Sequence, residues 1–202
     1  MSFNNILLNS LKNQTIDLKN NEQVNLYFVD FSNDNFVKKL EINLFNNNNV
    51  NLFGICVNNG HGKYCEININ HNGSNSKSKI FFKAFNKNKA MTSIICNSKA
   101  KEKTLNNAID QDIGGLLLDN NSSITALPCL DVDTNSIIAE HSVNIGQIDP
   151  EIVFYLNSKG LSVQEAYLLV IDSFVNNFSV NEAIDNQLHA NLKQSISKIL
   201  RG

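Results

Sequence analysis

The sequence predicts a mainly β body over residues 1–148, followed by a C-terminal helical domain over residues 149–202. Two observations predict this division. Short apolar stretches alternate with turns rich in Asn, Gly and Ser through the first part, at a spacing of about ten to fifteen residues that is typical of all-β proteins. Helix-capping signals replace this pattern directly after Ile148, beside Pro150, which is one of only two prolines in the chain.

Several of the apolar stretches alternate apolar and polar residues, which is the period of a half-buried strand. Strands are expected at residues 24–29, 39–45, 50–57, 64–69, 79–85, 92–96, 116–118, 124–132 and 136–141. The stretch from residue 97 to residue 112 is polar and lacks a strong pattern, so it is expected to be a connection, partly helical.

The spacing leaves a sandwich, a barrel and a β-solenoid open, because no strict repeat is visible. Hairpin signals of the Asn-Gly type are few, with Asn59-Gly60 and Asn72-Gly73 as the clear cases, and this favours the longer corners of a solenoid over a meander. The 36 asparagines would suit such corners. Codon drift in an AT-rich genome is the competing explanation for them.

Three helices are expected after the β body. Asp149 can cap the first, with Pro150 at its first position and Gly160 just past its end. Capping boxes that begin at Ser162 and Ser179 start the other two. Each of these two helices is expected to bury one apolar stripe. The expected stripes are Ala166, Leu169, Val170 and Phe174, and then Ile184, Leu188, Leu192, Ile196 and Leu200.

The charge and the termini exclude several classes of function. The net charge of -2 argues against a nucleic-acid-binding surface, and no apolar run is long enough to cross a membrane. The N-terminus lacks the features of a signal peptide, so the four cysteines are expected to be reduced thiols in the cytoplasm, with an organelle stroma as the alternative. No phosphate-binding loop is present, so no bound nucleotide is expected on this chain.

A loose cluster of metal-ligating residue types occurs at Cys56, His61, Cys65 and His71. Structural zinc sites more often show paired C-x-x-C ligands. Both cysteines also fall within strand patterns, where a free cysteine behaves as a small hydrophobic residue. We therefore expect these cysteines, together with Cys96, to be buried and structural.

Glu140 and His141 stand side by side at the end of the last expected strand. An imidazole beside a carboxylate can bind a metal or move protons near neutral pH. The alternative is a structural histidine, hydrogen-bonded at the seam between the β body and the helices. A small metal-dependent enzyme built on these two residues is the least favoured function, because no nucleophile or ligand set accompanies them.

An ordered set of segments in the second half resembles the SufB/SufD family. The segments are 116–119 (LLLD), 128–132 (PCLDV), 140–142 (EHS), 146–149 (GQID) and 154–161 (FYLNSKGL). The resemblance covers about residues 98–178 and implies a right-handed parallel β-helix with a C-terminal helical domain. The family's N-terminal helical region is expected to be absent, since strand patterns begin early in the chain.

The resemblance implies a non-catalytic scaffold subunit of the SUF iron–sulfur cluster assembly system. Such subunits pair with a second SufB/SufD-type subunit through the β-helix, and their C-terminal helices dock the ABC-type ATPase SufC. The residues expected to bind SufC are Phe154, Tyr155, Leu156, Ser158, Lys159 and Gly160. Alternatively, Phe154 and Tyr155 are core residues that tie the helices to the β-helix.

The resemblance also implies a transient iron–sulfur cluster shared with the partner subunit, with His141, Glu140 and Cys129 as candidate ligands and His141 as the iron ligand. The chain departs from the family at several ligand positions. Ile113 stands where SufB-type members carry a cysteine, and Ala139 and Ser142 replace other motif residues. The pattern is closer to SufD than to SufB. A degenerate β-solenoid interaction module without a cluster role is the alternative function.

Overall fold

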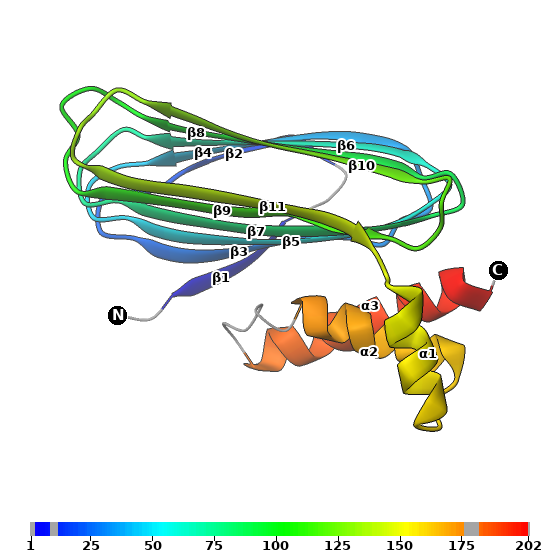
Figure 1. Cartoon of the computed structure of the whole chain (residues 1–202). Coiled ribbons are helices and arrows are strands. Elements are labelled where there is room, and N and C mark those ends of the chain that lie inside the picture. The colour runs from blue at the N-terminus through cyan, green and yellow to red at the C-terminus, as the bar shows by residue number, and fades with distance from the viewer. Residues whose placement is uncertain (1–2, 9–11, 176–181, 202) are drawn as a thin grey trace.

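The computed structural model describes residues 3–8, 12–175 and 182–201, and within these ranges the strands precede the helices (Figure 1). The strands are β1 (Asn4–Leu8), β2 (Gln14–Asp17), β3 (Gln23–Asp30), β4 (Phe36–Leu44), β5 (Asn49–Asn59), β6 (Gly62–His71), β7 (Lys77–Lys87), β8 (Met91–Ala100), β9 (Asn107–Leu117), β10 (Ser123–Val132) and β11 (Ile137–Gln147). The helices are α1 (Pro150–Ser158), α2 (Val163–Val175) and α3 (Glu182–Arg201).

The strands form two parallel sheets that face each other. Sheet A has the order β1-β3-β5-β7-β9-β11, and sheet B has the order β10-β8-β6-β4-β2. Consecutive strands fall in opposite sheets and every pairing is parallel, so the chain coils as a parallel β-solenoid of about five turns. The prediction of a mainly β solenoid followed by C-terminal helices is confirmed.

The length of a coil varies along the solenoid. Gln23 of β3 pairs with Asn49 of β5, 26 residues later, whereas Met91 of β8 pairs with Ser123 of β10, 32 residues later. A repeat of variable length leaves no strict period in the sequence, which explains why spacing alone did not select the solenoid.

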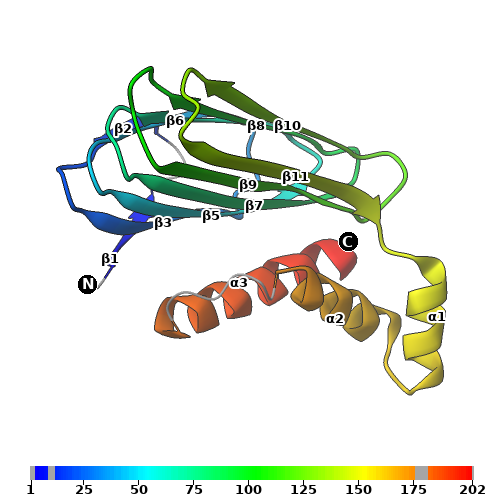
Figure 2. The ribbon, with the colours of Figure 1, turned by 60° about the vertical axis from the view of Figure 1, so that its left-hand side comes forward.

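Two apolar cores hold the fold together. The first fills the interior of the solenoid between the two sheets, and its members include Leu26, Ile42, Leu52, Phe82 and Ile94. The second lies between the outer face of sheet A and helices α2 and α3, which run along that face in Figure 2. Its members include Phe53, Phe85, Leu116, Ile171, Leu192 and Ile196. Sheet A is therefore covered on both faces where the helices lie against it.

This difference between the sheets is visible in the burial of their strands. In β5 of sheet A, nearly every residue from Val50 to Asn58 is buried, as expected of a strand covered on both faces. In β4 of sheet B, burial alternates along the strand, because only the inner face meets the core.

Asparagine backbones shape one corner of the solenoid. Asn21, Asn47, Asn75 and Asn106 each lie just before a strand of sheet A and have φ between 57° and 67°. Asn adopts this left-handed conformation more readily than other non-glycine residues. The Asn47 amide also donates to Oδ1 of Asn21 at 2.8 Å, so corners on successive coils are hydrogen-bonded. At these positions the asparagines do build solenoid corners.

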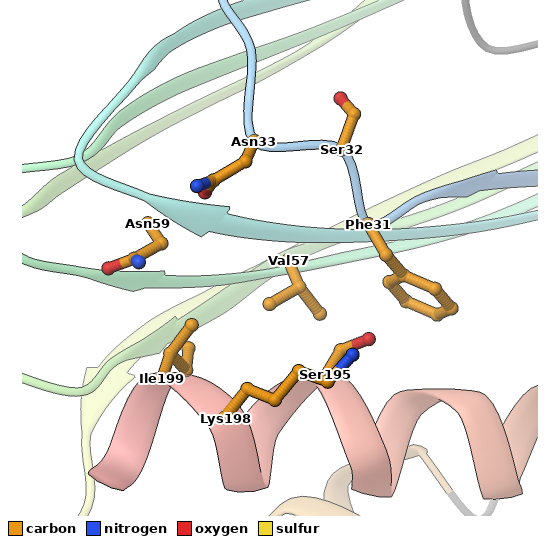
Figure 3. Close-up of a pocket in the computed structure, with 8 residues that line it drawn as sticks. All are labelled: Phe31, Ser32, Asn33, Val57, Asn59, Ser195, Lys198 and Ile199. Atoms are coloured by element: carbon orange, nitrogen blue, oxygen red, sulfur yellow. The ribbon is translucent and has the colours of Figure 1, made fainter. Parts of the chain in front are cut away.

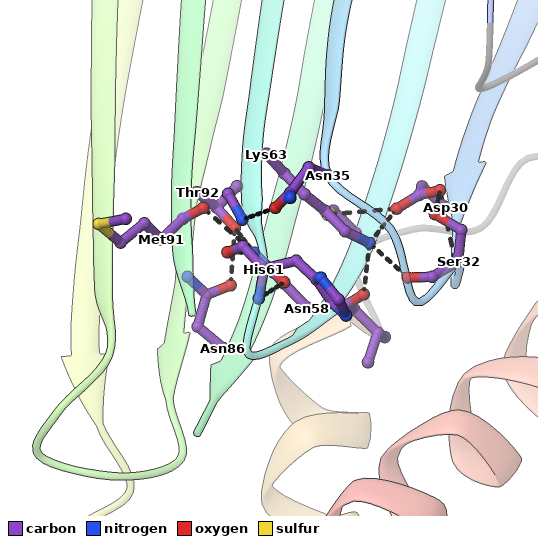
Figure 4. A network of polar contacts seen from close by, with 12 residues as sticks. Asp30, Ser32, Asn35, Asn58, His61, Lys63, Asn86, Met91 and Thr92 are labelled. Carbon is purple, nitrogen blue, oxygen red and sulfur yellow. Dashed lines mark hydrogen bonds and ion pairs between the residues drawn. The ribbon is translucent and has the colours of Figure 1, made fainter. Parts of the chain in front are cut away.

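A buried ion pair secures another corner (Figure 4). The Lys63 ammonium contacts the Asp30 carboxylate, and these side chains are 0% and 1% exposed. The same ammonium donates to the carbonyl oxygens of Ser32 at 2.8 Å and Val57 at 3.0 Å. These contacts connect β3, the segment after it, β5 and β6.

The expectation of a partly helical connection over residues 97–112 is wrong for most of this stretch, because only residues 101–106 lie between strands and none of them is helical. Residues 97–100 complete β8, and residues 107–112 begin β9. The inward positions there are filled by polar or small side chains, including Ser98, Ala100 and Gln111, so the apolar alternation of a strand is missing. Strands β1 and β2 were also missed, because both are short and largely exposed.

The capping predictions are confirmed for the first two helices. Asp149 accepts a hydrogen bond from the Glu151 amide at 2.8 Å, and Gly160 has φ +96° just after α1. The Ser162–Glu165 capping box is formed in both directions. The predicted box at Ser179 lies outside the described residues.

The predicted stripe of α2 is partly wrong. Leu169 is 48% exposed, and the buried residues of α2 are Ala166, Ile171 and Val175. On α3, Leu188, Leu192 and Ile196 are buried as expected. The side chain of Ile184 lies outside the described part of the structure.

Candidate functional site

The solenoid ends at β10 and β11, which are the edge strands of sheets B and A. Side chains of parallel register partners point to the same face. Val143 pairs with Ile113 of β9, which is 0% exposed in the interior core, so Val143 also points inward. Val143 is nevertheless 45% exposed, and the inward Ile145 is 37% exposed. We call the inward-facing side chains of β10 and β11 the open end.

His141 belongs to this open end. Its register partner is Gln111 of β9, which is buried in the interior, so the imidazole lies on the inner face of β11. The residue is exposed because β11 is an edge strand, on which no further coil stacks in the described part of the chain. An imidazole held on a regular strand and open on one side is available to bind a metal or a partner.

Glu140 lies on the opposite face of β11 from His141, since neighbouring residues of a strand alternate. Its register partner is Asp110, which forms an ion pair with Lys79 at 3.2 Å. All three line an outer groove of about 270 Å³. The two residues that are adjacent in sequence therefore do not converge on one site.

Cys129 lies in β10 of sheet B. Its register partner is Asn97, which lies between the inward-facing Cys96 and Ser98 of β8. Asn97 and Cys129 therefore both point outward. The Cys129 side chain is half-buried. His141, Glu140 and Cys129 are thus near the same end of the solenoid but on different faces. Across residues 3–8, 12–175 and 182–201, no group of three or more His, Cys, Asp or Glu side chains could hold a metal ion.

The other cysteines are buried, as the sequence predicts for Cys56, Cys65 and Cys96. Burial raises the pKa of the Cys56 thiol to about 12 and also raises the pKa values of the other two thiols, so all three stay protonated. His71 is also buried, with hydrogen-bonding contacts from Nδ1 to Ser76 Oγ at 2.7 Å and from Nε2 to Ser78 Oγ at 2.8 Å.

Helix α1 and the two residues after it contain the residues that the family resemblance implies for ATPase binding. Phe154 is 76% exposed and Tyr155 is 59% exposed, so the alternative that they are core residues is wrong. The Lys159 ammonium lies 5.4 Å from the centre of the Tyr155 ring, and α1 has no buried residue. The helix is a surface element with an aromatic patch.

Gln111 is a residue of this region that the sequence analysis missed. It is 0% exposed, and its Nε2 donates to Ser98 Oγ at 2.7 Å and to the Cys129 carbonyl at 3.4 Å. The sequence offers little signal for it, because it falls in the polar stretch of residues 97–112, which lacks an apolar strand pattern.

Two further cavities lie against α3. One of about 280 Å³ is lined by residues that include Phe31, Asn59 and Lys198 (Figure 3). The other, of about 330 Å³, lies between α3 and strands β1 and β3. Among the described residues that line them there is no histidine, cysteine or carboxylate, so these side chains do not join the groups at the open end.

No helix in the described part of the chain has both the length and the apolar character needed to cross a membrane.

Comparison with known proteins gives a consistent result. Residues 8–174 match the family model described as "SUF system FeS cluster assembly, SufBD core domain". The iron-sulfur cluster assembly SufBD family protein ycf24 of Galdieria sulphuraria is 30% identical over 104 residues, which cover 52% of this chain and 47% of that protein. SufBD family proteins of Staphylococcus haemolyticus and Staphylococcus epidermidis are each 31% identical over 111 residues, covering 54% of this chain and 23% of theirs.

The aligned stretch thus spans about half of the first of these relatives and about a quarter of the other two. The family model, in contrast, extends over most of the solenoid and the first two helices. This chain belongs to the SufBD family of the SUF iron–sulfur cluster assembly system.

Proposed function

We propose that this chain is a non-catalytic scaffold subunit of the SUF iron–sulfur cluster assembly complex. Membership of the SufBD family supports an assembly role. The strongest support for the proposal is the open end, where the inward-facing apolar side chains of Val143 and Ile145 are exposed. Solenoid coils bury their cores by stacking, so an end of this kind calls for a cap or a further coil.

A second SufB/SufD-type subunit would supply that further coil. Among the described residues, strands β10 and β11 each pair with a strand on one side only, so each presents an edge row of backbone donors and acceptors. A partner strand can pair with such an edge while apolar side chains provide burial. Val143 and Ile145 would then lose their exposure to water.

Two substitutions on β11 test the pairing. Val143→Asp places a carboxylate on the inner face of the open end, whereas Ile138→Asp places one on the outer face of the same strand, where Ile138 is already 67% exposed. We expect Val143→Asp to abolish co-purification with the partner scaffold and Ile138→Asp to retain it. Equal retention by both variants would remove the open end as the pairing surface.

Helix α1 is the proposed docking site for a SufC-type ATPase. Exposed aromatic residues on a helix without buried positions are typical of interaction surfaces. The proposed contact set is Phe154, Tyr155, Leu156, Ser158, Lys159 and Gly160. The ATPase supplies nucleotide binding to the complex, so this chain needs no nucleotide site of its own.

Point variants test this docking better than truncation, because α2 and α3 cover the core on sheet A. The double variant Phe154→Ser and Tyr155→Ser should lose the ATPase in co-purification. The matched control is Leu169→Ser, which removes an exposed apolar side chain from α2. If the double variant retains the ATPase as well as the control does, α1 is not the docking site.

His141 is the proposed contribution of this chain to a transient cluster that is assembled from iron and sulfide as substrates. One imidazole cannot hold a cluster, so the cluster also needs ligands from the partner subunit. Glu140 and Cys129 remain candidate ligands on the adjoining faces. This arrangement predicts weak iron binding by the isolated chain and strong binding by the mixed complex.

Anaerobic reconstitution of the mixed complex, followed by absorbance, tests the histidine. His141→Ala should keep the fold and ATPase binding but reduce cluster formation, whereas Gln147→Ala, at the exposed end of β11, is the matched control. The alternative, a degenerate interaction module without a cluster role, is favoured by Ile113 at the family's cysteine position. Normal cluster formation by His141→Ala complexes would support that alternative.

A further inference from the structure

The side chain of Gln111 is fixed at the end of the solenoid interior. It belongs to β9, the strand next to β11, and is 0% exposed. Its Nε2 donates to Ser98 Oγ in sheet B at 2.7 Å and to the backbone carbonyl of Cys129 at 3.4 Å. A flipped amide would direct Oε1 at the Cys129 carbonyl, where two acceptors would meet, so these contacts set which way the amide points.

The other end of this amide is unsatisfied. Oε1 of Gln111 is buried and has no hydrogen-bond partner in the described part of the chain. A buried acceptor without a partner costs about 1–3 kcal/mol. Such a cost is unusual in a native protein and calls for an explanation in terms of a nearby donor or a ligand.

The register shows which neighbour can supply the donor. Along sheet A, Gln111 is flanked on the inner face by Ile80 of β7 and His141 of β11. The isoleucine has no polar hydrogen. The imidazole has one N–H in its neutral form, and adjacent strands are only about 4.7–4.9 Å apart.

We propose that Gln111 is a positioning residue for His141: Oε1 of Gln111 accepts the ring N–H, and this fixes the tautomer and orientation of the imidazole. This contact requires the His141 ring to turn towards Oε1 by rotation about its side-chain bonds. The other ring nitrogen then carries the lone pair and faces the open end, as a metal-binding imidazole requires. This inference rests on the proposed function, in which His141 is the iron ligand, and adds the residue that orients it.

Glu140 does not take this role. Although it precedes His141 in sequence, it lies on the outer face of β11 among Asp110 and Lys79. Gln111 differs in being on the same face as the imidazole and in having its amide held from sheet B by Ser98. A neutral acceptor also leaves the charge of the open end unchanged.

Nitrogen NMR of the histidine rings in the isolated full chain tests the positioning directly. At a pH well above the ordinary pKa of histidine, wild-type His141 should be held predominantly as one tautomer. Gln111→Met, which keeps the length but removes the acceptor, should shift His141 towards the tautomer mixture of free imidazole. Gln111→Glu restores an acceptor oxygen and should restore the single tautomer, whereas Gln147→Met, at the exposed end of β11, should have no effect.

A wild-type His141 with the tautomer mixture of free imidazole would overturn the proposal without any variant, so the test does not depend on folding of Gln111→Met. The same tautomer in wild type and Gln111→Met would overturn it as well. This readout needs no cluster, so it separates the positioning from the proposed function. In the mixed complex, Gln111→Met should lower iron affinity about tenfold, as loss of a ligand-orienting group does. Unchanged affinity there, with affinity lost in His141→Ala, would also refute the positioning.

Discussion

Mild acid should lower the free energy of unfolding of this protein, because one of its histidines is buried in the neutral form. His71 is 0% exposed, and burial lowers its pKa to about 4 from the ordinary value of 6.5. Ser76 Oγ already donates to Asn107 Oδ1 at 2.9 Å, so it accepts from Nδ1–H of His71, and Nε2 accepts from Ser78. The folded state therefore holds the ring neutral in a defined tautomer.

The direction in which stability changes with pH follows from proton binding. Between the two pKa values the unfolded chain binds more protons than the folded chain, so stability falls as the pH falls through this window. Each pKa unit is worth about 1.36 kcal/mol, which gives a total of about 3 kcal/mol for this group. Between about pH 7.5 and about pH 5 the expected loss is about 2 kcal/mol. This range lies above the ordinary pKa values of the carboxyl groups.

Urea unfolding at a series of pH values measures this loss. His71→Gln removes the titrating ring, so its free energy of unfolding should change much less over the same range. His141→Gln, at the exposed open end, should keep the wild-type dependence on pH. The reasoning fails if His71→Gln loses as much stability as wild type, or if NMR shows His71 titrating near 6.5 in the folded chain.

Three further predictions concern the solenoid and its thiols. Asn47→Ala should lose about 1 kcal/mol more stability in urea unfolding than Asn47→Gly, because the backbone at φ 59° disfavours a Cβ; equal losses would contradict this. Lys63→Met should lower the free energy of unfolding by about 3–5 kcal/mol, because it leaves the buried Asp30 carboxylate without its cation. The double variant with Asp30→Leu should lose less stability than Lys63→Met alone. Cys129 should be the one thiol that reacts rapidly with a labelling reagent in the native chain, because it is half-buried while the other three are buried; a second fast thiol would argue against a packed interior.

Much of the fold could be predicted because apolar side chains mark the strands that build the cores. The two sheets even differ in pattern: the run from Ile80 to Phe85 in β7 is buried throughout, whereas burial alternates from Gly62 to His71 in β6. This contrast arises because the helices cover the outer face of sheet A. Continuous apolar runs therefore indicate strands of sheet A, and alternating runs indicate strands of sheet B.

Prediction failed where the interior is not apolar. Around β8 and β9 the inward residues include Ser98 and Gln111, which hydrogen-bond to each other. Two polar residues hydrogen-bonded across the interior carry no hydrophobic period, so a strand pattern cannot reveal them. The candidate site was affected in the same way, because Gln111 could be linked to His141 only through the strand register.

The two proposed functional surfaces are joined by a short length of chain. Strand β11 carries His141 and, among the described strands, is hydrogen-bonded to β9 alone. Gln147 at its end is followed by Ile148, Asp149 and then α1. Figures 1 and 2 show this strand leading directly into α1 at one end of the solenoid. Ile148 is 7% exposed and packs in the second core, so the junction is anchored to the body of the protein. An ATPase docked on α1 would therefore act on the strand that carries the proposed iron ligand, through a connection too short to absorb a large movement.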